Sequence, residues 1–331
     1  MTAATQPAAD ERSPDPAAAD LLTLRVTRIQ QVGAEILGVT FAAAGGGDLP
    51  AFVPGSHLVV AAGERTNAYS LTSDGTNPTE YSISVLRVAD GAGGSRWIHD
   101  QLSEGDLVLA HLPRSAFAPQ ARAGKHLLIA GGIGVTPIVS HLRAARRWHR
   151  NVQVLYAFRP ENPAHLGDLS DLAGDAAEFF SQRADFLNRL DEVLLGQPIG
   201  THLYVCGPAG FIDHVITAAA QAGWPDSRIH SERFGIDALD AGDPFAIRLT
   251  KSGKDIAVAS GTSMLEALEH AGIAVANRCR QGVCGECRIP LAGGNPIHRD
   301  LYLTDEEKTV GDAIMPCVSR APDGSTLEIP L

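Results

Sequence analysis

The sequence has no apolar run long enough to cross a membrane, so a membrane-embedded protein is not expected. Residues 1–20 lack the basic start and the apolar stretch of a secretory signal, and their Ala, Pro and Asp content predicts a disordered tail. Positive charge is not in excess either, since the formal net charge is −11, which argues against nucleic acid as the main partner. With no export signal and thiols left free, the chain is expected in the cytoplasm.

Cysteine is also scarce, and four of the five cysteines form one pattern near the C-terminus. Cys279, Cys284 and Cys287 have C-x4-C-x2-C spacing, and Cys317 follows at a distance. This is the spacing that binds a plant-type two-iron two-sulfur cluster. Gly282 lies inside the run, where glycine permits positive φ and a close backbone approach. The pattern therefore predicts a cluster with these four cysteines as ligands.

Two other uses of the cysteines remain open. Four cysteines also bind zinc, although zinc sites usually have two short pairs rather than a triplet and a remote fourth ligand. Disulfides are less favoured, because three cysteines in one loop are poorly placed to pair with each other. A cluster accepts one electron at a time, so the function predicted first is electron transfer.

The length of 331 residues suggests two or three domains. Residues 21–120 contain short β-rich segments broken by Gly, Pro, Asn and Asp, which predicts an antiparallel barrel; they are Leu24–Ile29, His57–Ala61, Glu80–Val88 and Leu107–His111. In residues 121–235, strands alternate with helices, which predicts an α/β domain with a parallel sheet; its strands are expected at His126–Ala130, Val152–Phe158, Glu178–Ser181 and Leu203–Cys206.

The remaining residues divide into a linker and a third domain. Residues 236–244 are acidic and contain Gly and Pro, as linkers do. Residues 245–331 carry the cysteines, and Phe245–Thr250 and Asp255–Ala259 are expected to pair as a hairpin. Ser263 and Glu266 have the spacing of a capping box, which predicts the start of a helix.

Glycine turns follow two strands of the predicted parallel sheet. Gly131, Gly132 and Gly134 precede Thr136-Pro137 at the start of a helix, where backbone amides can hold a pyrophosphate. The run is not the G-x-G-x-x-G fingerprint. Gly207 and Pro208 follow Cys206 at the end of a later strand, and the two turns together predict a nucleotide site.

A pyridine nucleotide delivers two electrons together and a cluster accepts one, so a flavin is expected between them. The barrel offers two segments for it. One carries Arg65, Asn67, Tyr69 and Ser70, with a ring and hydroxyls for the flavin ring; the other carries Gly93, Gly94 and Ser95, with amides and a hydroxyl for a phosphate.

With these motifs the chain resembles the phthalate dioxygenase reductase family, which includes vanillate demethylase reductases. The resemblance extends from Leu24 to Leu331 and includes Ser231–Phe234 and His298-Arg299-Asp300. It implies an FMN-binding barrel, an NAD-binding α/β domain and a C-terminal β-grasp-like ferredoxin domain with the 2Fe-2S cluster. It also implies FMN rather than FAD.

The resemblance implies roles for particular residues. Tyr69 and Ser70 would contact the flavin ring, the backbone of Val85, Leu86 and Arg87 would line its edge, and Gly93, Gly94 and Ser95 would hold the phosphate. Thr136 would approach the reactive flavin nitrogen, and Phe234 would cover the ring. Cys206 would lie beside the nicotinamide; a small buried apolar residue is the alternative.

The chain departs from the family pattern at two positions. Asn67 stands where the family commonly has arginine, and Ala92 stands where arginine is often found. An FMN phosphate usually has a cationic partner, which Arg65, Arg87 or Arg96 is expected to supply. For the coenzyme, Arg159 would suit a 2′-phosphate and Glu161 would repel it, so NADH is favoured over NADPH.

These inferences predict an enzyme that passes electrons from NADH through FMN and the cluster to a Rieske-type oxygenase. None of the twelve histidines lies two residues after a cysteine, so the Rieske centre is expected on a separate chain. A haem-thiolate monooxygenase is the second acceptor to consider. A simple flavin reductase and a non-catalytic zinc protein are also compatible with these motifs. Arg278, Arg280 and Arg288 either steer an acidic partner to the cluster or are ordinary solvated residues.

Overall fold

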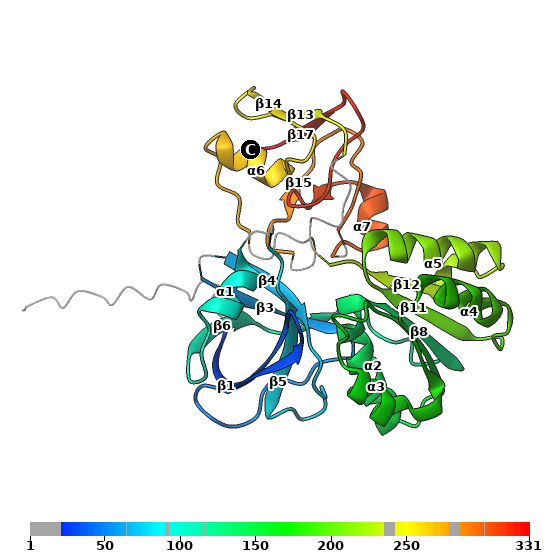
Figure 1. The fold of residues 1–331 in the computed structure, drawn as a ribbon. Helices are drawn as coiled ribbons and strands as arrows, with labels where there is room; N and C mark the ends of the chain where they lie inside the picture. Colours follow the sequence, from blue (N-terminus) through cyan, green and yellow to red (C-terminus); the bar gives the residue numbers. More distant parts are fainter. Residues whose placement is uncertain are drawn as a thin grey trace, which may run out of the picture.

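The computed structural model describes residues 21–63, 65–89, 93–115, 117–234, 242–277, 282, 285–300 and 302–331 (Figure 1). Three units follow one another along the chain, and the third, coloured yellow to red, lies above the other two in this view. The predicted tail of residues 1–20 and most of the predicted linker fall outside the described residues. Within the described residues, no helix combines the length and apolar character needed to span a membrane.

The first unit is an antiparallel barrel. Its sheet has the order β4-β3-β6-β1-β2-β5, with β7 paired to β3, and a bridge between Leu71 and Ile83 brings the end of β4 to β5. Side chains alternate between the two faces, and those of Leu24, Val26 and Tyr81 fill the interior. Its elements are β1 (Leu21–Gly33), β2 (Ile36–Ala43), β3 (Ser56–Ala62), β4 (Arg65–Ser70), β5 (Glu80–Leu86), α1 (Gly94–Asp100), β6 (Leu107–His111) and β7 (Arg114–Ser115).

The second unit is a parallel sheet of order β10-β9-β8-β11-β12 with helices on both faces. The strands are apolar on both faces, so neighbours such as Leu127 and Leu128 are buried in different cores. Its strands are β8 (Lys125–Gly131), β9 (Val152–Ala157), β10 (Ala177–Phe180), β11 (Thr201–Cys206) and β12 (Ile229–Glu232). Its helices are η1 (Gly132–Gly134), α2 (Val135–Arg147), α3 (Leu166–Ala173), η2 (Gly174–Ala176), α4 (Arg183–Leu195), α5 (Ala209–Gln221) and η3 (Asp226–Arg228).

The third unit is a small mixed sheet with short helices. Its main sheet has the order β14-β13-β17, in which β13 pairs antiparallel with β14 and parallel with β17. The predicted capping box is present, because Glu266 N donates to Ser263 Oγ at 3.1 Å and Ser263 N to Glu266 Oε2 at 2.9 Å. The elements are β13 (Phe245–Leu249), β14 (Asp255–Val258), α6 (Met264–His270), β15 (Ile289–Pro290), α7 (Asp305–Val310), β16 (Ala313–Ile314) and β17 (Thr326–Ile329).

A buried arginine joins the start of the third unit to its interior. Arg320 donates to the carbonyl oxygens of Thr262 at 2.6 Å, Asp243 at 2.9 Å and Ala259 at 3.0 Å. Its guanidinium also lies over the Phe245 ring, 5.2 Å from the centroid. One side chain thus ties the segment before β13 to the turn that precedes α6.

Replacing Arg320 by Leu is expected to destabilise the protein by about 2 kcal/mol, because three carbonyl oxygens lose their donor. Urea unfolding of the full chain, followed by circular dichroism, measures the change. The control is Arg248→Leu, which removes only the ion pair to Asp255 between two half-exposed side chains. We expect no measurable change from the control. Equal effects of the two substitutions would contradict the assignment.

Candidate functional site

A cavity of about 870 Å³ lies between the barrel and the parallel sheet. It borders the carboxyl ends of β8, β9 and β11, and the strand order reverses direction between β8 and β11. Open parallel sheets bind their ligands in crevices at such a point. Among the predicted site residues, those that line the cavity are Leu86, Arg87, Gly131, Gly132, Arg159, Gly207, Pro208 and Phe234.

The two glycine turns meet at the floor of this cavity. A Cβ on Gly134 would lie 2.4 Å from the Cys206 carbonyl oxygen, and a Cβ on Gly131 would lie 2.9 Å from the Phe211 ring. A Cβ on Gly207 would lie 2.9 Å from the Phe211 ring and 3.1 Å from the Gly131 Cα. α5 has no side-chain cap and its residue Gly210 lines the cavity, so the first-turn amides of this helix remain available to a pyrophosphate.

Three predicted residues of the first glycine turn lie behind the cavity wall. Gly134, Thr136 and Pro137 are buried. The Thr136 hydroxyl donates to the Ile133 carbonyl oxygen at 3.0 Å, so its oxygen can still accept a hydrogen bond. Thr136 therefore has a fixed orientation.

Cys206 ends β11 beside a buried carboxyl group. Its register partner on β12 is Glu232, and both residues are buried. Burial, with the Glu232 carboxylate adding to it, raises the pKa of the Cys206 thiol well above its ordinary value. Burial also raises the pKa of Glu232 to about 8, and its Oε2 has no hydrogen-bond partner. Sequence reasoning gave Glu232 no role, although it belongs to the Ser231–Phe234 motif.

Buried polar atoms without partners also gather on β3 and β4. The Tyr69 hydroxyl and the Ser70 Oγ have none, and burial raises the pKa of Tyr69. His57, the register partner of Ser70, has an unpartnered Nε2, and burial together with Arg114 lowers its pKa to about 4. Such atoms cost free energy unless a ligand satisfies them. A flavin ring, which carries donors and acceptors along its edge, fits them.

The predicted ring-edge strand borders the same region. Val85 is buried, and its carbonyl oxygen lies 2.9 Å from His99 Nε2. Leu86 and Arg87 border the cavity. The Arg87 guanidinium bonds both carboxylate oxygens of Asp100, at 2.5 and 3.1 Å, so it is already engaged.

The phosphate segment places one cation beside Gly93. A Cβ on Gly93, whose φ is 98°, would lie 3.8 Å from Arg96 Nη2. Gly94 lies against Asn67, because its Cβ would be 2.2 Å from Asn67 Oδ1, and Ser95 Oγ accepts from Val88 N at 3.2 Å. Ala92 and the Arg65 side chain lie outside the described residues.

Two of the four predicted cluster ligands are described, and they lie together. Cys287 and Cys317 are buried with their Sγ atoms 3.2 Å apart, longer than the ~2.05 Å bond of a disulfide. Cys279 and Cys284 lie outside the described residues, as do Arg278 and Arg280. Arg288 is ion-paired to Glu307 at 3.0 Å.

The glycine inside the cysteine run occupies a confined place. Gly282 has a φ of 72°, and a Cβ there would lie 2.6 Å from the Val318 side chain and 3.0 Å from the Asp300 Cα. Asp300 is buried and accepts from Leu303 N at 2.8 Å and Ser319 Oγ at 3.2 Å. Only glycine fits this position without displacing the segment next to Cys317.

Comparisons with known proteins bear on both halves of the chain. Residues 107–229 match the family described as dimethylamine monooxygenase subunit DmmA-like, N-terminal domain, and residues 247–322 match the 2Fe-2S iron-sulfur cluster binding domain. The chain is 38% identical to a carnitine monooxygenase reductase subunit from Acinetobacter baumannii, over 89% of this chain and 94% of that protein. It is 35% identical to phthalate dioxygenase reductase from Burkholderia cepacia, over 91% and 94%.

A solved phthalate dioxygenase reductase, described as a modular structure for electron transfer from pyridine nucleotides to [2Fe-2S], has a TM-score of 0.71 and 33% identity. The likeness covers 95% of this chain and 99% of that one. The chain belongs to the phthalate dioxygenase reductase family. Its membership confirms the predicted fold class of flavin barrel, NAD-binding α/β domain and ferredoxin domain. It also favours an iron-sulfur cluster over zinc, since the cysteine domain matches a cluster-binding family.

In this reductase, Glu232 is expected to make stability depend on pH. The folded pKa of about 8 lies above the ordinary value of 4.5, so between these pH values the folded state holds a proton that the unfolded state has lost. Stability therefore falls as pH rises from about 4.5 to 8. Glu232→Gln removes this slope and should gain stability over the wild type as pH rises.

Thermal melting at pH 5, 6.5 and 8 measures this difference. Glu192→Gln, at a mostly exposed side chain of α4, is the control and should not change the slope. A melting difference between Glu232→Gln and the wild type that stays constant across the three pH values would refute the prediction.

Proposed function

We propose that this protein is the reductase component of an oxygenase system and passes electrons from NADH through FMN and a 2Fe-2S cluster to a separate oxygenase. The observation that carries the proposal is a single cavity whose two walls suit two different redox groups. Its α/β wall has two glycine turns suited to a dinucleotide, and the barrel behind the other wall has unpartnered polar atoms suited to a flavin. The same chain supplies the cluster domain.

Most of the predicted residues have a task in this scheme. Tyr69 and Ser70 hydrogen-bond the flavin ring, and the backbone of Val85, Leu86 and Arg87 lines its edge. Gly93, Gly94 and Ser95 hold the phosphate, with Arg96 as its cation because Asp100 already engages Arg87. Bound there, FMN accepts the two electrons of a hydride and releases them singly.

The α/β unit holds and orients the coenzyme. The turns at Gly131, Gly132, Gly134 and Pro137, and at Gly207 and Pro208, bind its pyrophosphate, and Arg159 binds its ribose. Thr136, fixed by its bond to Ile133, and Cys206 lie just behind the cavity wall, where we assign Thr136 to the flavin side and Cys206 to the nicotinamide side. Phe234 lines the cavity and excludes water from the ring. Glu232, the register partner of Cys206, offers the nicotinamide amide a hydrogen bond from a buried carboxyl.

NADH is the preferred coenzyme in this proposal because carboxylates border the ribose end of the cavity. Glu161 lines the cavity beside Arg159, and Glu35 of the barrel lines the same side. A 2′-phosphate would meet these negative charges, whereas a ribose hydroxyl can donate to one.

Replacing Glu161 by Ser is expected to raise kcat/KM for NADPH about tenfold by removing repulsion worth roughly 1.4 kcal/mol. The value for NADH should change little or fall. Steady-state rates with both coenzymes measure the ratio, and Glu192→Ser, outside the cavity, is the control. An unchanged NADPH rate would remove Glu161 from coenzyme selection.

For the acceptor we propose a Rieske-type oxygenase on a separate chain. The support is that relatives are named as reductases of carnitine monooxygenase, vanillate demethylase and phthalate dioxygenase. A haem-dependent acceptor is the second candidate, because the chain is 37% identical, over 91% of its length, to the beta subunit of a heme-dependent oxidative N-demethylase from Ectopseudomonas mendocina. The cytoplasm keeps cysteines reduced, as cluster ligands must be, and we propose that the system works there.

Isolating the oxygenase that this reductase reduces would decide between the acceptors. The candidates are the oxygenases that co-purify with the reductase. Each is reduced with NADH and a catalytic amount of the reductase under anaerobic conditions. Bleaching of an iron-sulfur spectrum supports the Rieske type, and reduction of a haem absorption band supports the second candidate.

Replacing Cys317 by Ser is expected to abolish reduction of the oxygenase and of cytochrome c, because the cluster loses a ligand. Ferricyanide accepts electrons directly from flavins, so NADH oxidation with ferricyanide should continue. Spectrophotometric assays with the three acceptors measure this. Cys206→Ala is a contrasting variant, expected to slow all three. Oxygenase reduction at the wild-type rate in Cys317→Ser would identify a simple flavin reductase instead.

A further inference from the structure

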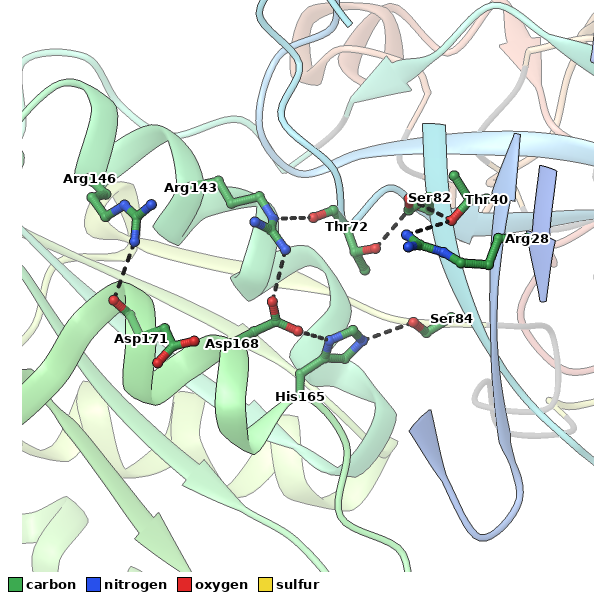
Figure 2. Close-up of polar contacts among 10 residues, drawn as sticks. All are labelled: Arg28, Thr40, Thr72, Ser82, Ser84, Arg143, Arg146, His165, Asp168 and Asp171. Carbon is green, nitrogen blue, oxygen red and sulfur yellow. Dashed lines mark hydrogen bonds and ion pairs between the residues drawn. The ribbon is translucent and has the colours of Figure 1, made fainter. Parts of the chain in front are cut away.

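A hydrogen-bonded network crosses the interface between the barrel and the α/β unit (Figure 2). His165, just before α3, lies at its centre with a side chain that is only 6% exposed. Its Nε2 lies 2.8 Å from Ser84 Oγ on β5, and its Nδ1 lies 2.7 Å from Asp168 Oδ2 on α3. Both ring nitrogens are therefore engaged, one by the barrel and one by the α/β unit.

The network continues to α2 through the same carboxylate. Arg143 Nη2 bonds Asp168 Oδ1 at 2.9 Å, and Arg143 Nε donates to the Thr72 carbonyl oxygen of the barrel at 2.7 Å. The Ser–His–Asp order resembles a hydrolase triad. However, Ser84 lies buried within a strand rather than exposed on a sharp turn, which does not suit a nucleophile. The contacts instead suit a junction between units.

The backbone at His165 is itself unusual. Its φ of 56° and ψ of 22° are left-handed, a conformation that costs a residue with a Cβ roughly 1–2 kcal/mol. Such a conformation persists where the surrounding contacts fix it, and the bonds to Ser84 and Asp168 do so here. These bonds therefore fix the position of His165, and with it the C-terminal end of the preceding loop.

That preceding loop, residues 158–164, forms part of the coenzyme cavity. Its residues Arg159, Glu161 and Asn162 line the cavity. The loop has a second attachment to the barrel, because Asn162 Oδ1 accepts from Glu35 N at 3.3 Å. It has one to its own unit as well, because Ala164 N donates to the Tyr156 hydroxyl at 3.2 Å. Barrel contacts therefore hold the loop that meets the coenzyme.

We propose that His165 is a positioning residue for the coenzyme: its bond to Ser84 of the flavin barrel fixes the 158–164 loop and thereby sets the affinity for NADH. The inference rests on the proposed function of the cavity and adds that the barrel controls part of the coenzyme site. His165 acts through the loop, since it does not line the cavity itself. Its effect belongs to binding, so it is expected in KM rather than in kcat.

Two variants remove the bond from opposite sides. Ser84→Ala deletes the hydroxyl from the strand, and His165→Asn shortens the side chain while keeping a residue type that tolerates left-handed backbone. Each is expected to raise KM for NADH about three- to tenfold, as the loss of one buried hydrogen bond allows, with kcat within about twofold of the wild type. The double variant should resemble His165→Asn alone, because that substitution already removes the bond to Ser84 as well as the His165 bond to Asp168.

Matched controls separate loop positioning from general loosening of the interface. Ser82→Ala changes the same strand, but the Ser82 hydroxyl contacts Thr40 Oγ1, at 3.3 Å, and not the loop. Arg147→Ala breaks another ion pair between the units, in which Arg147 of α2 contacts Asp74 of the barrel at 2.6 Å. Neither control should change KM for NADH.

Binding of ADP-ribose, measured by calorimetry on the FMN- and cluster-containing protein, gives a readout that does not depend on turnover. Its dissociation constant should rise in Ser84→Ala and His165→Asn by the same factor as KM. Equal shifts in the two controls, or a fall in kcat with KM unchanged, would overturn the role of His165. Failure of the wild-type protein to oxidise NADH or bind ADP-ribose would instead contradict the proposed function.

Discussion

Backbone crowding at the carboxyl ends of β8 and β11 shapes the cavity between the barrel and the parallel sheet. The turns after these strands approach so closely that a side chain on Gly134 would collide with the opposite turn, and one on Gly131 would collide with the Phe211 ring of α5. This approach places the starts of α2 and α5 beside each other, so that Gly132 of one turn and Gly207 of the other line one cavity. It also leaves Cys206 and Glu232 buried directly behind that cavity. Fold and binding site therefore depend on the same few glycines.

The barrel contributes in a different way, through polar atoms that it buries without partners. Three such atoms lie on two neighbouring strands: His57 Nε2, the Tyr69 hydroxyl and Ser70 Oγ. Without a bound ligand, the burial of each would destabilise the barrel. A protein that retains such atoms gains from them only when a ligand supplies the missing partners. The free-energy cost is thus concentrated where the flavin is proposed to bind. The apolar core of the barrel packs behind this region and stabilises it.

Local patterns were predictable from the sequence, and long-range contacts were not. The cysteine spacing, the glycine turns and the Ser263–Glu266 capping box depend on residues close together in the chain, so each could be read directly. The equivalent box at Thr304 and Glu307 was readable by the same rule but was missed. Strand β2 was not predicted, because it is buried on both faces and its sequence shows no alternation of apolar and polar residues. His165 and Ser84 are 81 residues apart, and no local pattern links them.

The state of Cys206 has a consequence for chemical durability. Peroxide and alkylating reagents attack the thiolate form of cysteine and spare the thiol. Burial beside Glu232 keeps Cys206 as a thiol and excludes reagents from it. A redox protein that works with an oxygenase can therefore keep this sulfur unmodified, and the resistance comes from burial within the sheet.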